Sequence, residues 1–366
     1  VVALSAPRWF FALTGDDDYI AGPTHIVQEV MADAALAWQH LGQPGHLLHQ
    51  GFPGGHQISR LKREAVYAFF ATALDAPDLE GLEDGTLFVD DPALHFKPPK
   101  GNRTVLDVVR DLLDEALAAL DAPSREGLAL ILGNPGAGTG TLVLEETGTV
   151  PLPGRVVREE GPDLPVDLYR PEGWSGGRGV LCIAREGRAA CAAPGRLLSS
   201  VGWTVLSADL RGYGELLADW PLNDTWDFAR TVNLTVMLGD PLPNMQARDV
   251  ADLASALRSH EDLDSVGLLG VGPEGGFLSL LFGAAIPTLD PVVALAPHLS
   301  LRGDYDDLDA LYPNPCQIYP FGMFTAAAPE DLLGLVAPRD YYVTDHWNAE
   351  GKDQNSLCSF FISLWK

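Results

Sequence analysis

Apolar and polar positions at the start of this chain predict a strand and a helix, followed by a second such pair. The apolar run from Trp9 to Thr14 predicts a buried strand that ends at Gly15. Residues 46–49 form a short strand candidate, and residues 60–74 have the periodicity of a helix. Residues 24–41 predict the first helix, because apolar residues recur there at three- and four-residue spacing: Ile26, Val30, Ala34, Ala37 and Leu41.

The middle of the chain interrupts this rhythm. Residues 75–104 are rich in Asp, Pro and Gly and show little periodicity, which is typical of an irregular connection. An amphipathic helix is predicted from Val105 to Leu120. We therefore divide the chain into residues 1–80, a linker with a connecting helix over 81–124, and a second domain over 125–366.

Strands and helices alternate again after residue 142. Strands are predicted at residues 165–170, 179–184, 203–210, 265–269, 291–296 and 339–344. Helices are predicted at residues 190–201, 243–259, 276–286 and 329–335. This alternation predicts an α/β fold with a doubly wound, mostly parallel sheet.

A short internal similarity links the two ends of the chain. Residues of the same type recur 331 positions apart, in Leu4, Ala6, Pro7, Arg8, Phe10, Phe11 and in Leu335, Ala337, Pro338, Arg339, Tyr341, Tyr342. Each segment runs into a predicted strand, so we interpret the two segments as equivalent parts of two tandem copies. The second copy differs after its strand, where residues 345–349 replace the acidic cluster, and we expect its end to be truncated or altered.

Composition limits the partners of this protein. The 366 residues carry a formal net charge of −26, which disfavours nucleic acid, whereas a neutral polymer or a small uncharged ester is compatible. No apolar run reaches the roughly 18 residues of a membrane span, so no membrane partner is expected. The four cysteines lack zinc spacing, and we predict neither a metal nor a cofactor: Cys182, Cys191, Cys316 and Cys358. Cys182 lies in an apolar strand and is predicted to be a core residue.

A glycine-rich segment at residues 133–140 looks like a phosphate-binding loop. The lysine that would reach the phosphates is absent, and no helical pattern follows. We therefore predict a glycine-rich turn.

Candidate catalytic groups lie close to the first two predicted strands. The cluster Asp16–Asp18 follows the first strand, and His56 follows Gly54 and Gly55 just before a helix. With the stretch from Asp209 to Glu215 and the strand–turn–helix at 265–286, these segments resemble the α/β-hydrolase superfamily, in particular tandem-domain proteins similar to acetyl xylan esterases and related carbohydrate esterases. The resemblance covers most of the chain.

This resemblance implies roles for two residues. Asp18 matches the acid of a Ser–His–Asp triad, with Asp16 and Asp17 as alternatives, and His56 matches the base. In these hydrolases the serine precedes both. The chain starts at Val1 rather than Met, so we expect a fragment of a longer protein whose nucleophile lies upstream.

The second copy lacks a recognisable nucleophile. Two registers of the expected Gly-x-Ser-x-Gly turn compete, one placing Gly272 at the serine position and the other Glu274. Glu274 is a carboxylate that could act as a nucleophile, but we expect a surface residue in a degenerate site. Where such esterases carry an oxyanion loop, this chain has residues 185–188, Arg-Glu-Gly-Arg.

The prediction is therefore a fragment of a serine carboxyl-ester hydrolase that acts on acylated carbohydrate and carries a second, non-catalytic hydrolase domain. The chain alone should be inactive. Its partners are an acylated carbohydrate or small ester and the missing N-terminal part of the same protein. The resemblance also implies a secreted or periplasmic location.

Two other interpretations stay open. The chain would be a polysaccharide-binding or scaffold module if its aromatic residues stack on sugars, namely Trp203, Tyr213, Trp220 and Trp226. It would be a permuted hydrolase if residues 1–75 complete the sheet of the second copy.

Overall fold

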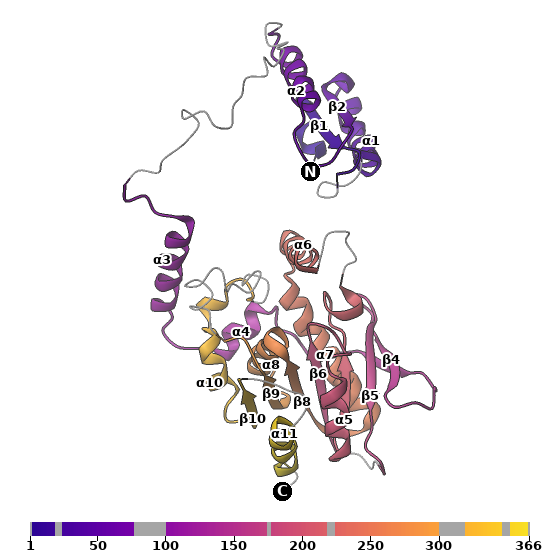
Figure 1. Ribbon diagram of the computed structural model, residues 1–366, viewed down its shortest axis with the longest axis vertical. Helices are drawn as coiled ribbons and strands as arrows, with labels where there is room; N and C mark the ends of the chain where they lie inside the picture. Colours follow the sequence, from indigo (N-terminus) through magenta and orange to yellow (C-terminus); the bar gives the residue numbers. More distant parts are fainter. Residues whose placement is uncertain are drawn as a thin grey trace. The chain divides into compact units, whose positions relative to one another are not determined.

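A computed structural model describes residues 2–18, 24–76, 100–173, 177–217, 224–299, 319–345 and 352–364. The chain divides into two compact units, Val1–Asn102 and Arg103–Lys366, called here the N-terminal and the C-terminal unit (Figure 1). The predicted boundaries at residues 80 and 124 stay predictions, and linker residues 81–99 lie outside the described residues.

The N-terminal unit has the predicted order of strand, helix, strand and helix. A 3-10 helix at Val2–Ser5 precedes β1 (Phe10–Gly15), α1 (Thr24–His40), a 3-10 turn at Pro44–His46, β2 (Leu47–Phe52) and α2 (Arg60–Ala73). Strands β1 and β2 pair in parallel, with Phe10 opposite Leu47 and Gly15 opposite Phe52. This arrangement places the loops after both strands at the same edge of the sheet.

Helices α1 and α2 pack against β1 through aromatic side chains. The ring of Trp38 on α1 is fully buried and lies 6.3 Å from that of Phe10. The ring of Phe69 on α2 lies 5.2 Å from that of Phe11, which is the next residue along β1. Because successive strand residues point to opposite faces, the two helices cover opposite faces of β1.

The C-terminal unit contains the larger sheet. Its strands are β3 (Thr141–Leu144), β4 (Leu152–Val157), β5 (Leu164–Tyr169), β6 (Gly177–Ala184), β7 (Thr204–Ala208), β8 (Leu263–Val271), β9 (Leu289–Leu295) and β10 (Tyr341–Thr344). Its α-helices are α3 (Val105–Ala118), α4 (Arg125–Ile131), α5 (Ala192–Ser200), α6 (Asp224–Met237), α7 (Leu242–Glu261), α8 (Gly272–Ala285), α10 (Leu332–Val336) and α11 (Lys352–Ser363). Short 3-10 turns lie at Gly214–Leu216, Met323–Thr325 and Pro329–Asp331.

Within the described residues these strands form one sheet in the order β10-β9-β8-β6-β7-β5-β4-β3. The five strands from β10 to β7 are parallel to one another, and β5, β4 and β3 continue the sheet in antiparallel pairings. The sheet is thus mixed: its predicted parallel part runs from the β10 edge to β7, and the antiparallel strands form the opposite edge. Its strands β3 and β4 were not predicted, because both are short and half exposed and β4 contains Pro153 and Gly154.

Each face of this sheet carries its own core. On β6, Leu181 and Ile183 point into the core formed with α7 and α8. Val180 and Cys182 point into the core formed with α5 and α11, so the predicted core position of Cys182 is confirmed. In the part of the chain that the structure describes, no helix has the length and hydropathy needed to cross a bilayer.

Candidate active site

The loops after β1 and β2 bring Asp18 and His56 together. Nδ1 of His56 lies 3.1 Å from Oδ2 and 3.2 Å from Oδ1 of Asp18. The Asp18 side chain is 5% exposed and that of His56 is 54% exposed. A buried carboxylate therefore holds one ring nitrogen of an imidazole whose remaining surface is open to solvent.

Backbone contacts fix the two loops against each other. The N–H of Asp16 donates to the carbonyl of Phe52 at 2.9 Å, and that of Asp17 donates to Gly54 at 3.2 Å. A Cβ at Gly15 would collide with the carbonyls of Gly54 and Gly55, so this approach requires glycine. The sequence at the end of β1 thus permits the close loop contact that brings Asp18 to His56.

Among the three adjacent acids, the structure distinguishes Asp18 from the other two. Asp16 is exposed, and its carboxylate accepts a hydrogen bond of 2.9 Å from the Thr24 hydroxyl. Asp17 is exposed as well. Asp18 therefore has the geometry expected of an acid that orients His56, and its catalytic role stays a prediction.

Two other histidines of this unit, His46 and His49, make local contacts. His46 stacks on Trp9 with ring centroids 4.2 Å apart, and its Nδ1 lies 2.9 Å from the carbonyl oxygen of Pro7. Nε2 of His49 lies 3.0 Å from the Thr14 hydroxyl. These contacts explain both side chains without a catalytic role.

In the C-terminal unit, the backbone of the turn from β8 into α8 favours Gly272 over Glu274 at the serine position of Gly-x-Ser-x-Gly. Gly272 has φ +77°, the positive backbone angle that favours glycine, and no atom lies within 4 Å of the place where its Cβ would be. A Cβ at Gly270 would instead collide with the backbone of Gly275. Gly272 therefore occupies the tip of the strand-to-helix turn, where a nucleophile elbow presents its serine.

Glu274 is buried, so the expectation of a surface residue was wrong. Its side chain is fully inaccessible, and Oε1 accepts a hydrogen bond of 2.5 Å from Nη1 of Arg185. Burial raises the pKa of Tyr213 well above its ordinary value, and the neighbouring Glu274 carboxylate raises it further. The ion pair joins the residue after β6 to the first turn of α8. Its sequence signal was one charged residue directly after a predicted strand and one of opposite charge in the turn that follows another.

The loop after β6 is held by a buried aspartate. Asp209 accepts hydrogen bonds from the Arg188 N–H at 2.6 Å, from Arg188 Nη1 at 2.7 Å and from the Glu215 N–H at 3.1 Å. Gly187 and Gly214 pack directly against this carboxylate. The backbone donor of Arg188 is thus committed to Asp209 rather than directed at a substrate oxyanion.

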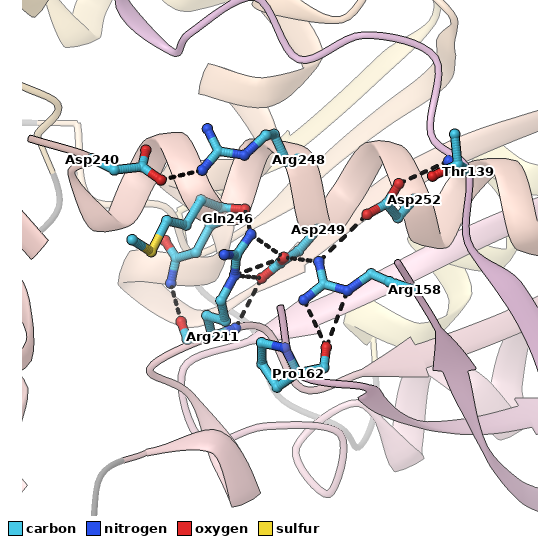
Figure 2. A network of polar contacts seen from close by, with 10 residues as sticks. Thr139, Arg158, Pro162, Arg211, Asp240, Gln246, Arg248, Asp249 and Asp252 are labelled. Carbon is cyan, nitrogen blue, oxygen red and sulfur yellow. Dashed lines mark hydrogen bonds and ion pairs between the residues drawn. The ribbon is translucent and has the colours of Figure 1, made fainter. Parts of the chain in front are cut away.

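A second buried aspartate fixes the loop after β7 (Figure 2). Asp249 on α7 is fully buried and accepts hydrogen bonds from Arg158 Nη1 at 2.5 Å and from Arg211 Nε at 2.9 Å. Arg158 follows β4 and Arg211 follows β7, so one carboxylate connects a helix to two strand ends. The Arg211 segment that carried part of the sequence resemblance therefore has a structural role here.

The glycine-rich segment before β3 is a turn, as predicted, because β3 rather than a helix follows it. It borders a cavity of about 470 Å³ that is also lined by Arg158, Arg211, Arg248 and carboxylates. Each of these arginines pairs with an aspartate. Across the described parts of the chain, no group of His, Cys, Asp and Glu side chains has an arrangement that would hold a metal ion.

The aromatic residues considered for sugar stacking are not available at the surface where the structure describes them. Trp203 and Tyr213 are buried in the core. Trp220 and the Trp226 side chain lie outside the described residues.

The chain is similar in structure to several solved proteins. A candidate acetyl xylan esterase from Bacteroides fragilis aligns over 73% of this chain and 80% of its own, with a TM-score of 0.55 and 12% identity. Acetyl xylan esterases from Thermoanaerobacterium and Paenibacillus align at TM-scores of 0.44 and 0.43, each at 16% identity, over 69% and 73% of this chain and 99% and 96% of their own. No family model and no curated protein matches the sequence. The chain therefore shares the α/β fold of the Bacteroides fragilis structure.

Proposed function

We propose that Asp18 and His56 are the acid and the base of a serine carboxyl-ester hydrolase. The contact of 3.1 Å between a buried carboxylate and a half-exposed imidazole carries this proposal, because it joins the loops after two adjacent parallel strands. With Nδ1 directed at Asp18, the Nε2 of His56 is the nitrogen that takes the proton from a serine hydroxyl and returns it to the leaving group. Asp18 orients the ring and stabilises the imidazolium.

The substrate class is an acylated carbohydrate. The Bacteroides fragilis structure with the same fold is described as a candidate acetyl xylan esterase, which supports an acetyl or similar acyl group on a polysaccharide. The net charge of −26 fits a neutral chain of this kind better than an anionic one.

The C-terminal unit is a non-catalytic copy of the same fold. Glycine at residue 272 leaves the elbow without a nucleophile, and the Arg185–Glu274 pair joins the end of β6 to the first turn of α8 beside it. The matching segments at Leu4–Phe11 and Leu335–Tyr342 support two tandem copies. The serine that serves His56 then comes from another hydrolase core, which lies outside this chain.

Acetate release from acetylated xylan tests the proposed function. The protein encoded by the complete reading frame should release acetate, and His56→Ala should lower the rate by about 10³-fold or more, because only oxyanion stabilisation and binding would remain. His49→Ala, which removes an imidazole at the Thr14 hydroxyl, is the matched control. Chain 1–366 by itself should be inactive. Activity that His56→Ala leaves unchanged would exclude the proposed dyad.

A scaffold or polysaccharide-binding role for the C-terminal unit is the second candidate. Its intact sheet and its glycine at the elbow favour a domain that retains the fold but has no catalytic activity. The burial of Trp203 and Tyr213 removes two of the four proposed stacking residues. Retention of the chain on insoluble xylan would support this candidate, and a chain that passes through unretained would count against it.

A further inference from the structure

One edge of β1 in the N-terminal unit has no partner strand within the residues that the structure describes, whereas the corresponding strand of the C-terminal unit, β10, is paired. Among the described residues, β1 pairs on one side only, with β2. β10, which begins at Tyr341, 331 positions after the first residue of β1, pairs in parallel with β9 through Tyr341 opposite Val292. The edge of β1 that would correspond to this pairing has no partner strand in the described chain.

Three apolar side chains of the N-terminal unit are exposed, whereas the residues 331 positions later in the C-terminal unit are buried. Leu4 is 83% exposed, whereas Leu335 is 9% exposed. Ile26 and Val30 on α1 are 49% and 53% exposed, whereas Leu357 and Phe361 on α11 are fully buried. Each pair is 331 positions apart, as in the repeat. The apolar character of these three positions is therefore kept in both units, but only one unit buries it.

In the C-terminal unit these positions contact the hydrolase core. Phe361 packs edge-on against Trp203 with ring centroids 4.7 Å apart, and its carbonyl accepts a hydrogen bond of 3.3 Å from Trp203 Nε1. Leu357 belongs to the same cluster, together with Leu198 of α5. α11 thus covers the α5 face of the sheet, and Ile26 and Val30 stand at the matching positions of α1.

An arginine of the repeat follows the same pattern. The Arg339 guanidinium donates to the carbonyls of Gly283 at 2.5 Å and Leu289 at 2.8 Å, at the end of α8 and the start of β9. Arg8, the corresponding residue, is exposed. Strand edge, apolar face and arginine of the N-terminal unit are therefore arranged for the contacts that β10, α11 and Arg339 make with their core.

We propose that the open edge of β1, with Leu4, Arg8, Ile26 and Val30, is a docking surface for an α/β-hydrolase core that has a free β9-type strand. This inference rests on the proposed function, because it identifies the partner that supplies the serine. β8 and β10 lie on either side of β9, so docking places the elbow after a β8-type strand two positions from β1. The elbow, Asp18 and His56 then share the carboxyl edge of one sheet, as a triad requires.

The test extends the full chain at its N-terminus with a second copy of residues 103–331. Residue 1 corresponds to residue 332, so this junction keeps the repeat in register. Hydrogen exchange of the β1 amides should slow at least tenfold relative to the unextended chain. Ile26→Asp with Val30→Asp should abolish this protection. Leu36→Asp, at a 65% exposed position of the same helix, should leave it intact.

A serine in the added copy separates docking from chemistry. Gly272→Ser in that copy should give ester hydrolysis that His56→Ala abolishes. Slow exchange of β1 without hydrolysis would support docking and count against the proposed function. Unchanged exchange of β1 in a folded extended chain would overturn the docking surface, whatever its activity.

Hydrogen exchange also shows whether the added copy is folded. Both copies yield identical peptides, and an unfolded copy would split the exchange of each such peptide into a fast and a slow population. In that event the measurement uses a chain that ends at Ala337, which lacks β10 and α11 and so leaves a β9 edge free. Protection of β1 that depends on Ile26 and Val30 is again the expected result. Its absence in that chain, with the remaining strands protected, would overturn the proposal.

Discussion

Two glycines at one turn differ in what they tolerate. Gly270 touches the backbone of Gly275, whereas Gly272 has open space around its missing Cβ but φ +77°. We expect Gly272→Ala to lower the free energy of unfolding by about 1–2 kcal/mol, the cost of a left-handed residue. Gly270→Ala should cost more than about 3 kcal/mol, because backbone must move. Urea unfolding measures both, and equal losses would contradict the assignment of Gly272 to the open tip of the turn.

The Arg185–Glu274 pair offers a second test at the level of residues. Arg185→Met removes the positive charge that pairs with the buried Glu274 carboxylate, so we expect a loss of about 3 kcal/mol or more in stability at neutral pH. Adding Glu274→Gln removes the charge and should recover most of that loss. Unfolding curves of the single and double variants measure the difference. If the double variant is no more stable than Arg185→Met, the charge of Glu274 without Arg185 is not the cause of the lost stability.

Glu261 links stability to pH. Burial by itself would raise the pKa of Glu261, but hydrogen bonds from Arg170 and His260 outweigh it, and the pKa lies below its ordinary 4.5. A carboxyl group with a lowered folded-state pKa stabilises the fold above its unfolded-state pKa, and this contribution is lost as pH falls through the folded-state value. We expect Glu261→Gln to lower Tm at pH 7, with the difference from the parent shrinking below about pH 4. Glu145→Gln, at an exposed position, is the control.

At the scale of elements, helix α1 shows how periodicity and packing can disagree. The spacing of Ile26, Val30 and Leu41 predicted one apolar face, yet all three are about half exposed. The buried residues are Met31, Ala34 and Trp38. α1 is apolar on two sides, and β1 uses only the side that carries Trp38. The periodicity therefore predicted the helix correctly, and its second apolar side is the one assigned to docking.

The two sheets should differ in local stability. β1 has one neighbouring strand among the described residues, whereas β6 lies between β7 and β8 at the centre of its sheet. Two-stranded sheets are marginal by themselves, so we expect the β1 amides of the full chain to exchange at least about 100-fold faster than those of β6. Hydrogen exchange followed by mass spectrometry compares the two strands directly. Equal protection would mean that the β1 edge is already covered in the full chain.

At the scale of the whole molecule, two units with separate cores should unfold in separate steps. Trp38 is a core residue of the N-terminal unit, and Phe361 contacts Trp203 in the C-terminal unit. Trp38→Ala and Phe361→Ala should each cost about 3–5 kcal/mol, and each should shift only the transition of its own unit. Differential scanning calorimetry of the full chain and both variants measures this. A single transition that both substitutions shift equally would contradict independent units.

The sequence by itself determined the order of most strands and helices, although not α4, α6 or α11. It also determined the loops that carry Asp18 and His56 and the absence of a serine at the β8–α8 turn. These are local properties, because an apolar period or a glycine-rich turn is set by neighbouring residues. β3 and β4 escaped prediction because their short, half-exposed segments lack such a period.

Only the tertiary structure decided which groups meet. It selected Asp18 among three adjacent acids, buried Glu274 against Arg185, and turned Ile26 and Val30 outward. Each outcome depends on segments far apart in the chain, and periodicity shows that a face is apolar without showing what covers it. For that reason the two loops could be predicted from the sequence, whereas the contact of Asp18 with His56 and the open edge of β1 became visible only in the fold.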